Sequence, residues 1–135
     1  MATVLIIGAS RGIGWELARQ YVAAGERVIA TGRDDAALAR LRDLGAQALR
    51  VDVADAASIS GLAWQLDGEK IDIALYVAGV TSHGDATEPP TSEAFDTVMH
   101  ANVLGAMQAI PQVAPLLAPG GRFGFVSSVM GRIAT

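Results

Sequence analysis

The feature that most restricts the fold is an apolar run that leads directly into a glycine-rich loop. Thr3–Ile7 (TVLII) is continuous, without polar alternation, which is typical of a strand buried on both faces of a parallel sheet. The segment after the loop has helical spacing, and Gly25 is its natural end. The apolar face expected for this helix consists of Ile13, Leu17, Tyr21 and Ala24. The beginning of the chain therefore predicts a buried strand, a turn and an amphipathic helix.

The alternation of strand and helix patterns continues along the chain. Further strands are predicted at Arg27–Thr31, Ala48–Val53, Ile71–Val77 and Arg122–Ser127. Asp34 or Asp35 is expected to cap a second helix, with its apolar face at Leu38, Leu41 and Leu44 and its end at Gly45. Asp55 is expected to open a third helix, with Ile59, Leu62, Ala63 and Leu66 on one face. A fourth helix is predicted from about Glu93 to Leu117, bent by Pro111 and Pro115.

This order of elements predicts an α/β fold with a doubly wound, Rossmann-like parallel sheet of strand order 3-2-1-4-5. In such a sheet ligands bind beyond the carboxyl ends of the strands, here near strands 1 and 4. The polar DGEK stretch around Gly68 is expected to be a solvated turn, and Ala78–Ser92 a loop. The fifth strand would be left as an open apolar edge, which suggests that the fold continues beyond this chain.

Size and composition exclude several classes of function. With 135 residues, 51% of them hydrophobic, the chain is expected to form a single domain, residues 1–135. No apolar run approaches the ~18 residues of a membrane span, and MATVLII has no basic region before it. A net charge of −4 without a basic cluster argues against nucleic acid or an anionic membrane as a partner. The absence of cysteine excludes disulfides and thiol chemistry and fits a cytoplasmic protein.

The glycine loop, GASRGIG, predicts dinucleotide binding. Gly8 allows a sharp turn, Gly12 a close approach of the backbone to a pyrophosphate, and Gly14 close packing of helix on strand. The helix N-terminus would add free N–H groups and a positive dipole end for the phosphates. The alternative is a turn that is merely rich in glycine, but a preceding strand and a following helix favour the binding site.

The spacing Gly-x-x-x-Gly-x-Gly, with IGASRGIG near the start and VSSVMG near the end, resembles the short-chain dehydrogenase/reductase family over the whole chain. The small carbonyl-reductase and C-factor-like members are the most similar. This resemblance implies an oxidoreductase that transfers hydride between a nicotinamide and a carbonyl or alcohol substrate, and a homodimer or homotetramer. The cofactor-binding stretch that it implies in the loop is Gly8, Ser10, Arg11, Gly12, Ile13 and Gly14.

The end of strand 2 favours NADP over NAD. Enzymes that use NAD usually carry an acidic residue here, whereas this chain has Thr31-Gly32-Arg33. Arg33 can pair with a 2′-phosphate, and Arg11 can approach the same group from the glycine loop. Asp34 and Asp35 lie beyond the key position and are interpreted as helix caps. NADP is therefore the expected cofactor, with NAD as the alternative.

Two further segments match the family's cofactor site. Asp52 and Val53 resemble its Asp-hydrophobic pair beside the adenine, although Asp52 could equally be a turn residue. Ala78 and Gly79 match the end of its Asn-Asn-Ala-Gly motif and would give close backbone access to the cofactor. Tyr76 and Val77 replace the two asparagines of that motif.

The resemblance also implies two catalytic residues, Asn102 in HANVLGA and Ser128 in SSVMG. In the family, the asparagine holds a water of the proton relay, and the serine holds the substrate oxygen. Its Tyr-x-x-x-Lys pair has no counterpart here, because the only tyrosines are Tyr21 and Tyr76 and the only lysine is Lys70. We therefore expect this chain to be the N-terminal, cofactor-binding part of a reductase and to be inactive alone.

Two other functions compete with this hypothesis. A non-catalytic dinucleotide-binding or sensor module would account for the missing Tyr-Lys pair and the replaced asparagines. A methyltransferase with a related sheet would need a carboxylate after strand 2, which Thr31-Gly32-Arg33 does not provide. No metal site is predicted, because His83 and His100 belong to no cluster with metal-ligand spacing.

Overall fold

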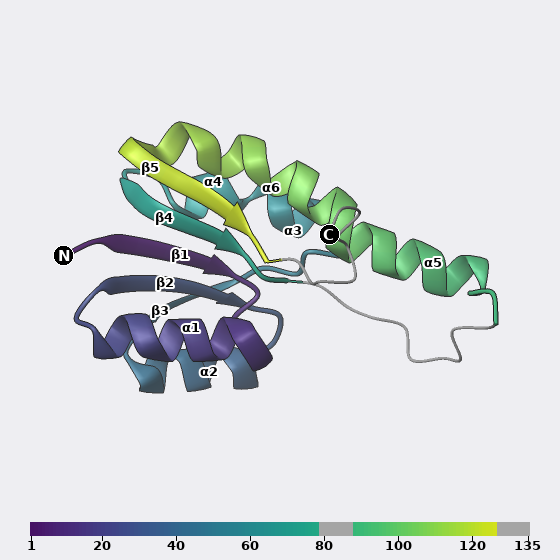
Figure 1. The fold of residues 1–135 in the computed structure, drawn as a ribbon, viewed down its shortest axis with the longest axis horizontal. Coiled ribbons are helices and arrows are strands. Elements are labelled where there is room, and N and C mark those ends of the chain that lie inside the picture. Colours follow the sequence, from purple (N-terminus) through teal and green to yellow (C-terminus); the bar gives the residue numbers. More distant parts are fainter. Residues whose placement is uncertain (79–87, 127–135) are drawn as a thin grey trace, which may run out of the picture.

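A five-stranded parallel sheet forms the centre of the molecule. The computed structural model describes residues 1–78 and 88–126. The strands are β1 (Thr3–Ile7), β2 (Arg27–Gly32), β3 (Gln47–Arg50), β4 (Ile71–Tyr76) and β5 (Leu117–Phe125), and they lie in the order β3-β2-β1-β4-β5 (Figure 1). The predicted α/β class and strand order are therefore confirmed.

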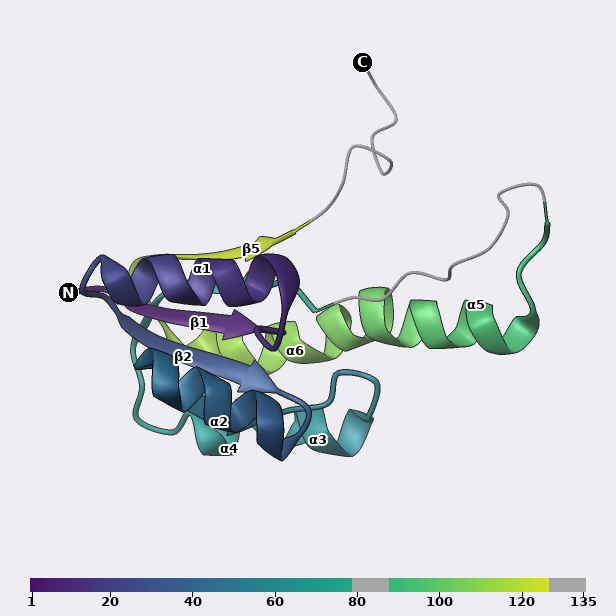
Figure 2. The same ribbon diagram turned by 90° about the horizontal axis from the view of Figure 1, so that it is seen from below.

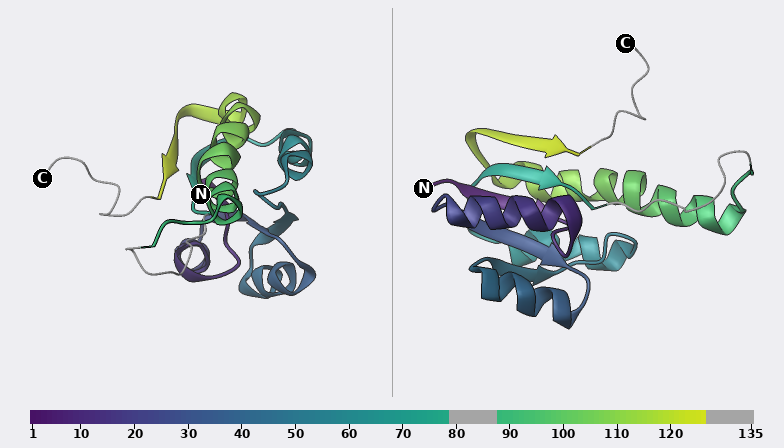
Figure 3. Two further views of the ribbon diagram at one scale, coloured as in Figure 1. Left: turned by 90° about the vertical axis from the view of Figure 1, so that its right-hand side faces the viewer. Right: turned by 60° about the horizontal axis from the view of Figure 1, so that its bottom comes forward.

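Helices cover both faces of the sheet. On one face lie α1 (Gly12–Ala23) and α2 (Asp35–Leu44), and on the other lie α3 (Ala56–Ser60), α4 (Leu62–Gln65) and α6 (Gly105–Val113) (Figures 2 and 3). The helix α5 (Ser92–Met99) extends past the carboxyl ends of the strands (Figure 1). A π-helical turn, η1 (His100–Leu104), joins α5 to α6, and a 3₁₀ turn, η2 (Ala114–Leu116), follows α6. Within the described residues, no helix combines the length and apolarity needed to cross a membrane.

The strand β1 divides the hydrophobic core into two layers. Leu5 and Ile7 pack with the side chains of α3, α4 and α6, whereas Val4 and Ile6 pack with those of α1 and α2. All four are fully buried, which explains why this strand has no polar alternation. Each such side chain stabilises the fold by about 1.5–3 kcal/mol.

The predicted helix ends are confirmed where a side chain or a glycine determines them. Asp34, rather than Asp35, caps α2, and its carboxylate accepts a hydrogen bond of 2.8 Å from the Ala37 N–H. Gly45 ends that helix with a φ of 108°, a left-handed conformation that glycine adopts without strain. Asp55 caps α3 by accepting from the Ala57 N–H at 3.0 Å.

Three predicted elements differ in extent. The helix after Asp55 is divided at Gly61 into α3 and α4, although the predicted core residues Ile59, Leu62 and Leu66 are all buried. The strand β3 ends at Arg50, because the Asp52 N–H turns away to donate to the Ser58 hydroxyl at 2.8 Å. The strand β5 begins at Leu117 instead of Arg122, because an irregularity opposite Ile71–Ile73 accommodates the intervening residues.

The long helix and α1 also differ from expectation. The interruption of the long helix is the π-helical turn at His100–Leu104, whereas Pro111 lies inside α6 without ending it. On α1, the buried positions are Gly14 and Ala18, while Ile13 is 59% exposed. Ile13 therefore does not belong to the core, and Ala24 is likewise exposed.

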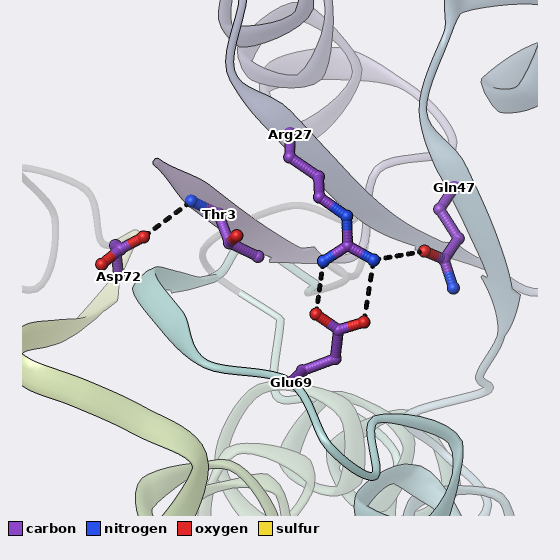
Figure 4. Close-up of polar contacts among 5 residues, drawn as sticks. All are labelled: Thr3, Arg27, Gln47, Glu69 and Asp72. Atoms are coloured by element: carbon purple, nitrogen blue, oxygen red, sulfur yellow. Dashed lines mark hydrogen bonds and ion pairs between the residues drawn. The ribbon is translucent and has the colours of Figure 1, made fainter. Parts of the chain in front are cut away.

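The amino ends of four strands are joined by polar side chains. Arg27, at the start of β2, makes a two-point ion pair with Glu69, one of its contacts being 2.8 Å long, and also donates to Gln47 at 3.1 Å (Figure 4). The Thr3 N–H donates to the Asp72 carboxylate at 2.8 Å. The DGEK stretch is therefore only partly a solvated turn, since Glu69 is held by Arg27.

Replacement of Glu69 by glutamine should destabilise the protein by about 1 kcal/mol at neutral pH. The Arg27 guanidinium holds the pKa of the Glu69 carboxyl below its usual 4.5. A depressed pKa means that the stabilisation is complete above pH 4.5 and is lost as the pH falls below it. Chemical denaturation should therefore give a difference between wild type and Glu69→Gln that shrinks in acid.

The matched control is Glu16→Gln, which breaks the exposed pair with Arg19 on α1. It should change the unfolding free energy less than Glu69→Gln. If the free energy of unfolding of Glu69→Gln equals that of wild type at neutral pH, or differs from it by the same amount at every pH, the ion pair with Arg27 does not stabilise the fold as predicted.

Candidate functional site

The glycine loop brings three backbone segments into contact. Gly8 has a φ of 93°, and a Cβ on it would lie 2.5 Å from the Ala78 Cα, just after β4. A Cβ on Gly14 would lie 2.0 Å from the Gly8 carbonyl oxygen. Gly8 therefore makes a turn in the left-handed region, and Gly14 lets the first turn of α1 pack against the backbone directly after β1. Gly12 has a φ of 62° and no atom within 4 Å of its ideal Cβ position, so this part of the loop faces open space.

Thr31, at the end of β2, fixes the start of this loop. Its side chain is 1% exposed, and its hydroxyl accepts a hydrogen bond of 2.9 Å from the Gly8 N–H. Its carbonyl accepts a second bond of 2.9 Å from the Ala9 N–H. The sequence alone predicts no role for Thr31. A hydroxyl at the end of an otherwise apolar central strand was the signal that could have identified it.

A cavity of about 340 Å³ lies beyond the carboxyl ends of β1, β2 and β4 and beside the N-terminus of α1. The predicted residues that line it are Gly8, Ser10, Arg11, Gly12, Ile13, Gly14, Arg33, Asp52, Val53 and Ala78. Further lining residues, which are not among those predicted from the sequence, are Thr31, Gly32, Val51, Ala54, Val77, Thr97, Ala101 and Val126. Its volume falls within the ~300–1,000 Å³ of ligand pockets.

The charged groups beside the cavity divide into engaged and available ones. Asp34 caps α2, and Asp35 forms an ion pair with Arg50, which also donates to the Arg33 carbonyl at 3.2 Å. In residues 1–78 and 88–126, the guanidinium groups of Arg11 and Arg33 make no hydrogen bond or ion pair. The cavity therefore offers two available cations, while the two carboxylates that follow Arg33 in the chain, Asp34 and Asp35, already have partners.

A further arginine holds the glycine loop from outside. Arg40 on α2 donates a hydrogen bond of 2.9 Å to the Ser10 carbonyl. Its guanidinium carbon lies 5.8 Å from the centre of the Trp15 ring, within the range of a cation–π contact. Arg40 thus links α2 to the residue that precedes Arg11.

Asp52 combines both interpretations that its position allowed. It lines the cavity together with Val53, as a cofactor contact would. Its carboxylate also accepts a hydrogen bond of 3.0 Å from the Ala54 N–H, as a turn residue would. The second carboxylate oxygen has no partner among the described residues.

Of the two predicted catalytic residues, Asn102 and Ser128, only Asn102 lies in the part of the chain that the structure describes. Asn102 lies in the π-helical turn, directly after the cavity-lining residue Ala101, but is not itself among the described lining residues. Ser128 lies outside the described residues, as does Gly79 of the predicted cofactor set. In the described part of the chain, no three His, Cys, Asp or Glu side chains come together as metal ligands.

Tyr76, which stands at the first asparagine of the family motif, is a buried polar residue close to this turn. It is 3% exposed, and its hydroxyl donates a hydrogen bond of 2.5 Å to the Ala101 carbonyl. Burial raises the pKa of the phenol to about 12. The hydroxyl therefore stays protonated, and remains a donor, across the physiological range.

Comparison with known proteins gives matches over almost the whole chain. Residues 2–135 match the family model described as short chain dehydrogenase. The 1-hydroxy-2-glutathionyl-2-methyl-3-butene dehydrogenase of Rhodococcus sp. (strain AD45) is 34% identical over 98% of this chain and 59% of its own length. The cyclic-di-GMP-binding biofilm dispersal mediator protein of Escherichia coli (strain K12) is 32% identical over 96% of this chain and 54% of its own.

A solved structure likewise matches most of this chain and about half of its own length. The RhlG/NADP active-site complex of Pseudomonas aeruginosa superposes with a TM-score of 0.74 and 34% identity over 85% of this chain and 47% of its own. The chain thus spans about half the length of the relatives that it matches. With the family model matching 2–135 and the glycine loop at its expected place after β1, the chain belongs to the short-chain dehydrogenase family.

Proposed function

We propose that residues 1–135 form a dinucleotide-binding domain, the cofactor half of an NADP(H)-dependent oxidoreductase that acts on a carbonyl or alcohol. The observation that carries this proposal is the cavity over the glycine loop, with two available arginines and two engaged carboxylates at one side. A bound NADP in the RhlG complex of Pseudomonas aeruginosa supports the same cofactor here.

The lining residues fit such a cofactor. The open space at Gly12 and the N–H groups of the first turn of α1 suit a pyrophosphate. Arg11 and Arg33 would hold the 2′-phosphate, and Asp52 and Val53 would lie beside the adenine. Ala78 and Gly79 would let the backbone approach the nicotinamide half. The cofactor, when bound, supplies or accepts the hydride of the reaction.

The chain's own contribution to the chemistry would be positioning. In this proposal Asn102 holds a water of the proton relay, and the Ser128 hydroxyl donates a hydrogen bond to the substrate oxygen. That bond would strengthen as negative charge develops on the oxygen, which is the effect that accelerates the reaction. We further propose a cytoplasmic location.

A second candidate, a non-catalytic dinucleotide sensor, has two observations in its favour. Tyr76 and Val77 stand where the family carries two asparagines. The name of the biofilm dispersal mediator of Escherichia coli gives the binding of cyclic-di-GMP and no reaction. Turnover measurements separate the two candidates.

Assembly as a homodimer or homotetramer is part of the proposal. Apolar side chains at helical spacing stay exposed along α5, η1 and α6: Phe95, Met99, Val103, Met107 and Ile110. Met107, which is 64% exposed, is the most exposed of them. Such a stripe is typical of a contact between subunits.

Replacement of Met107 by glutamate should weaken this assembly, because the contact would have to bury a charge. Light scattering should then report a smaller particle than for wild type. Trp64→Gln, on α4, removes a side chain that is 83% exposed and should leave the particle size unchanged. An unaltered assembly in Met107→Glu would contradict the proposed surface.

Replacement of Arg33 or Arg11 by alanine should weaken NADP⁺ binding by about tenfold or more. Each change removes a charge-assisted hydrogen bond to the 2′-phosphate, which NAD⁺ lacks, so NAD⁺ affinity should change little. Titration calorimetry with both cofactors measures the difference. Arg42→Ala, on the exposed side of α2, is the control and should affect neither. Equal losses for the two cofactors would contradict a 2′-phosphate site.

Replacement of Ser128 by alanine should lower turnover by about a hundredfold, because the substrate oxygen loses a donor. The dissociation constant of NADP⁺ should stay within twofold. Turnover is followed by NADPH oxidation in the whole protein, with diacetyl as the carbonyl probe. Unchanged turnover in Ser128→Ala would favour the sensor.

A further inference from the structure

We propose that Tyr76 is a positioning residue, whose buried hydroxyl holds the π-helical turn that carries Asn102. This inference rests on the proposed function, in which Asn102 takes part in catalysis. It concerns a residue that replaces the first asparagine of the family motif and that has no assigned role.

The turn is a defined irregularity within a long helix. The Gly105 N–H donates to the His100 carbonyl, five residues earlier, so η1 contains one residue more than an α-helical turn. That extra residue changes the direction of the side chains in the turn relative to a continuous helix. Single π-helical turns of this kind are frequent at functional sites. Asn102 lies in its middle.

The Tyr76 hydroxyl contacts this turn directly. It donates to the Ala101 carbonyl at 2.5 Å, and both residues are 3% exposed. Ala101 precedes Asn102 in the chain and lines the cavity. The hydrogen bond therefore connects the end of a central strand to the backbone next to Asn102.

Gly105 lies opposite the Tyr76 hydroxyl, and its lack of a Cβ leaves room for that hydroxyl. A Cβ on Gly105 would lie 2.5 Å from the Tyr76 hydroxyl oxygen and 2.9 Å from the Val53 carbonyl oxygen. Only glycine therefore lets the hydroxyl reach the turn without a shift of the helix. On the other side, the Tyr76 ring contacts Phe125 of β5, with the ring centres 6.0 Å apart. These contacts leave the phenol little freedom.

Core packing alone does not require the hydroxyl. A phenylalanine would fill nearly the same volume among the neighbouring apolar side chains. What the hydroxyl adds is one directed bond to a carbonyl of the turn. The raised pKa of the phenol keeps the hydroxyl protonated over the working range of pH. Its hydrogen bond to the Ala101 carbonyl is therefore kept across that range.

A double-mutant cycle with Tyr76→Phe and Asn102→Ala tests the inference in the whole protein. Turnover is measured with NADPH and diacetyl, NADP⁺ affinity by calorimetry and stability by chemical denaturation. Tyr76→Phe should lower kcat about tenfold, with NADP⁺ affinity within twofold. In the Asn102→Ala background it should lower kcat less than twofold, because the residue that it positions is gone.

Hydrogen exchange of the cofactor-free protein provides a readout that is independent of activity. Tyr76→Phe should speed exchange of the Gly105 N–H, whereas Tyr21→Phe, the change of the chain's other tyrosine, should alter neither exchange there nor kcat. Unaltered exchange in Tyr76→Phe would overturn the inference. So would an equal loss of kcat in both backgrounds, since a general loss of stability acts whether or not Asn102 is present.

Failure of the proposed function has a different signature. If Asn102→Ala alone leaves turnover unchanged, the catalytic role of Asn102 is wrong, and the positioning role falls with it. If Asn102→Ala lowers turnover but Tyr76→Phe does not, the proposed function stands and only the inference is overturned.

Discussion

The close approach of backbones at Gly8 is the constraint on which the rest of the site depends. The end of β1, the Ala78 backbone after β4 and the start of α1 meet where two missing Cβ atoms leave room. The Thr31 hydroxyl fixes the same point from β2. Because three strands and a helix converge there, the open part of the loop at Gly12 has one position relative to the cavity. A larger residue at Gly8 or Gly14 would separate these elements before it touched any ligand.

The side chains around the cavity divide into those that build it and those that face into it. Asp34 and Arg40 serve the fold, through a helix cap and a bond to the glycine loop, and the Asp35–Arg50 pair lies between β3 and α2. Arg11 and Arg33 make no such contact among the described residues. The proposed preference for a phosphorylated ribose would thus follow from the partners that Asp34 and Asp35 already have, as much as from the two arginines.

The sequence predicted the features that depend on local pattern. Strand order follows from the alternation of strands and helices, the caps at Asp34 and Asp55 from short-range hydrogen bonds, and the glycines of the loop from their conformational freedom. The other lining residues of the loop are those that the resemblance to the family implies. The features that it did not predict depend on contacts between distant residues. Thr31 matters only because Gly8 lies beside it, and Glu69 only because Arg27 starts β2, with β1 between them in the sheet. The Tyr76 hydroxyl reaches the π-helical turn only because Gly105 has no Cβ there. Ile13 has an apolar side chain, yet lines the cavity instead of the core.

The ion pair of Arg27 and Glu69 lies at the amino ends of the strands, and the cavity lies at their carboxyl ends. The polar contacts that stabilise the sheet and the proposed ligand site are therefore located at opposite edges of one sheet. Arginines such as Arg33 can change during evolution without loss of the contacts that hold the strands together. Within a common scaffold, a change of cofactor preference then needs few compensating substitutions, and selection can act on the two edges separately.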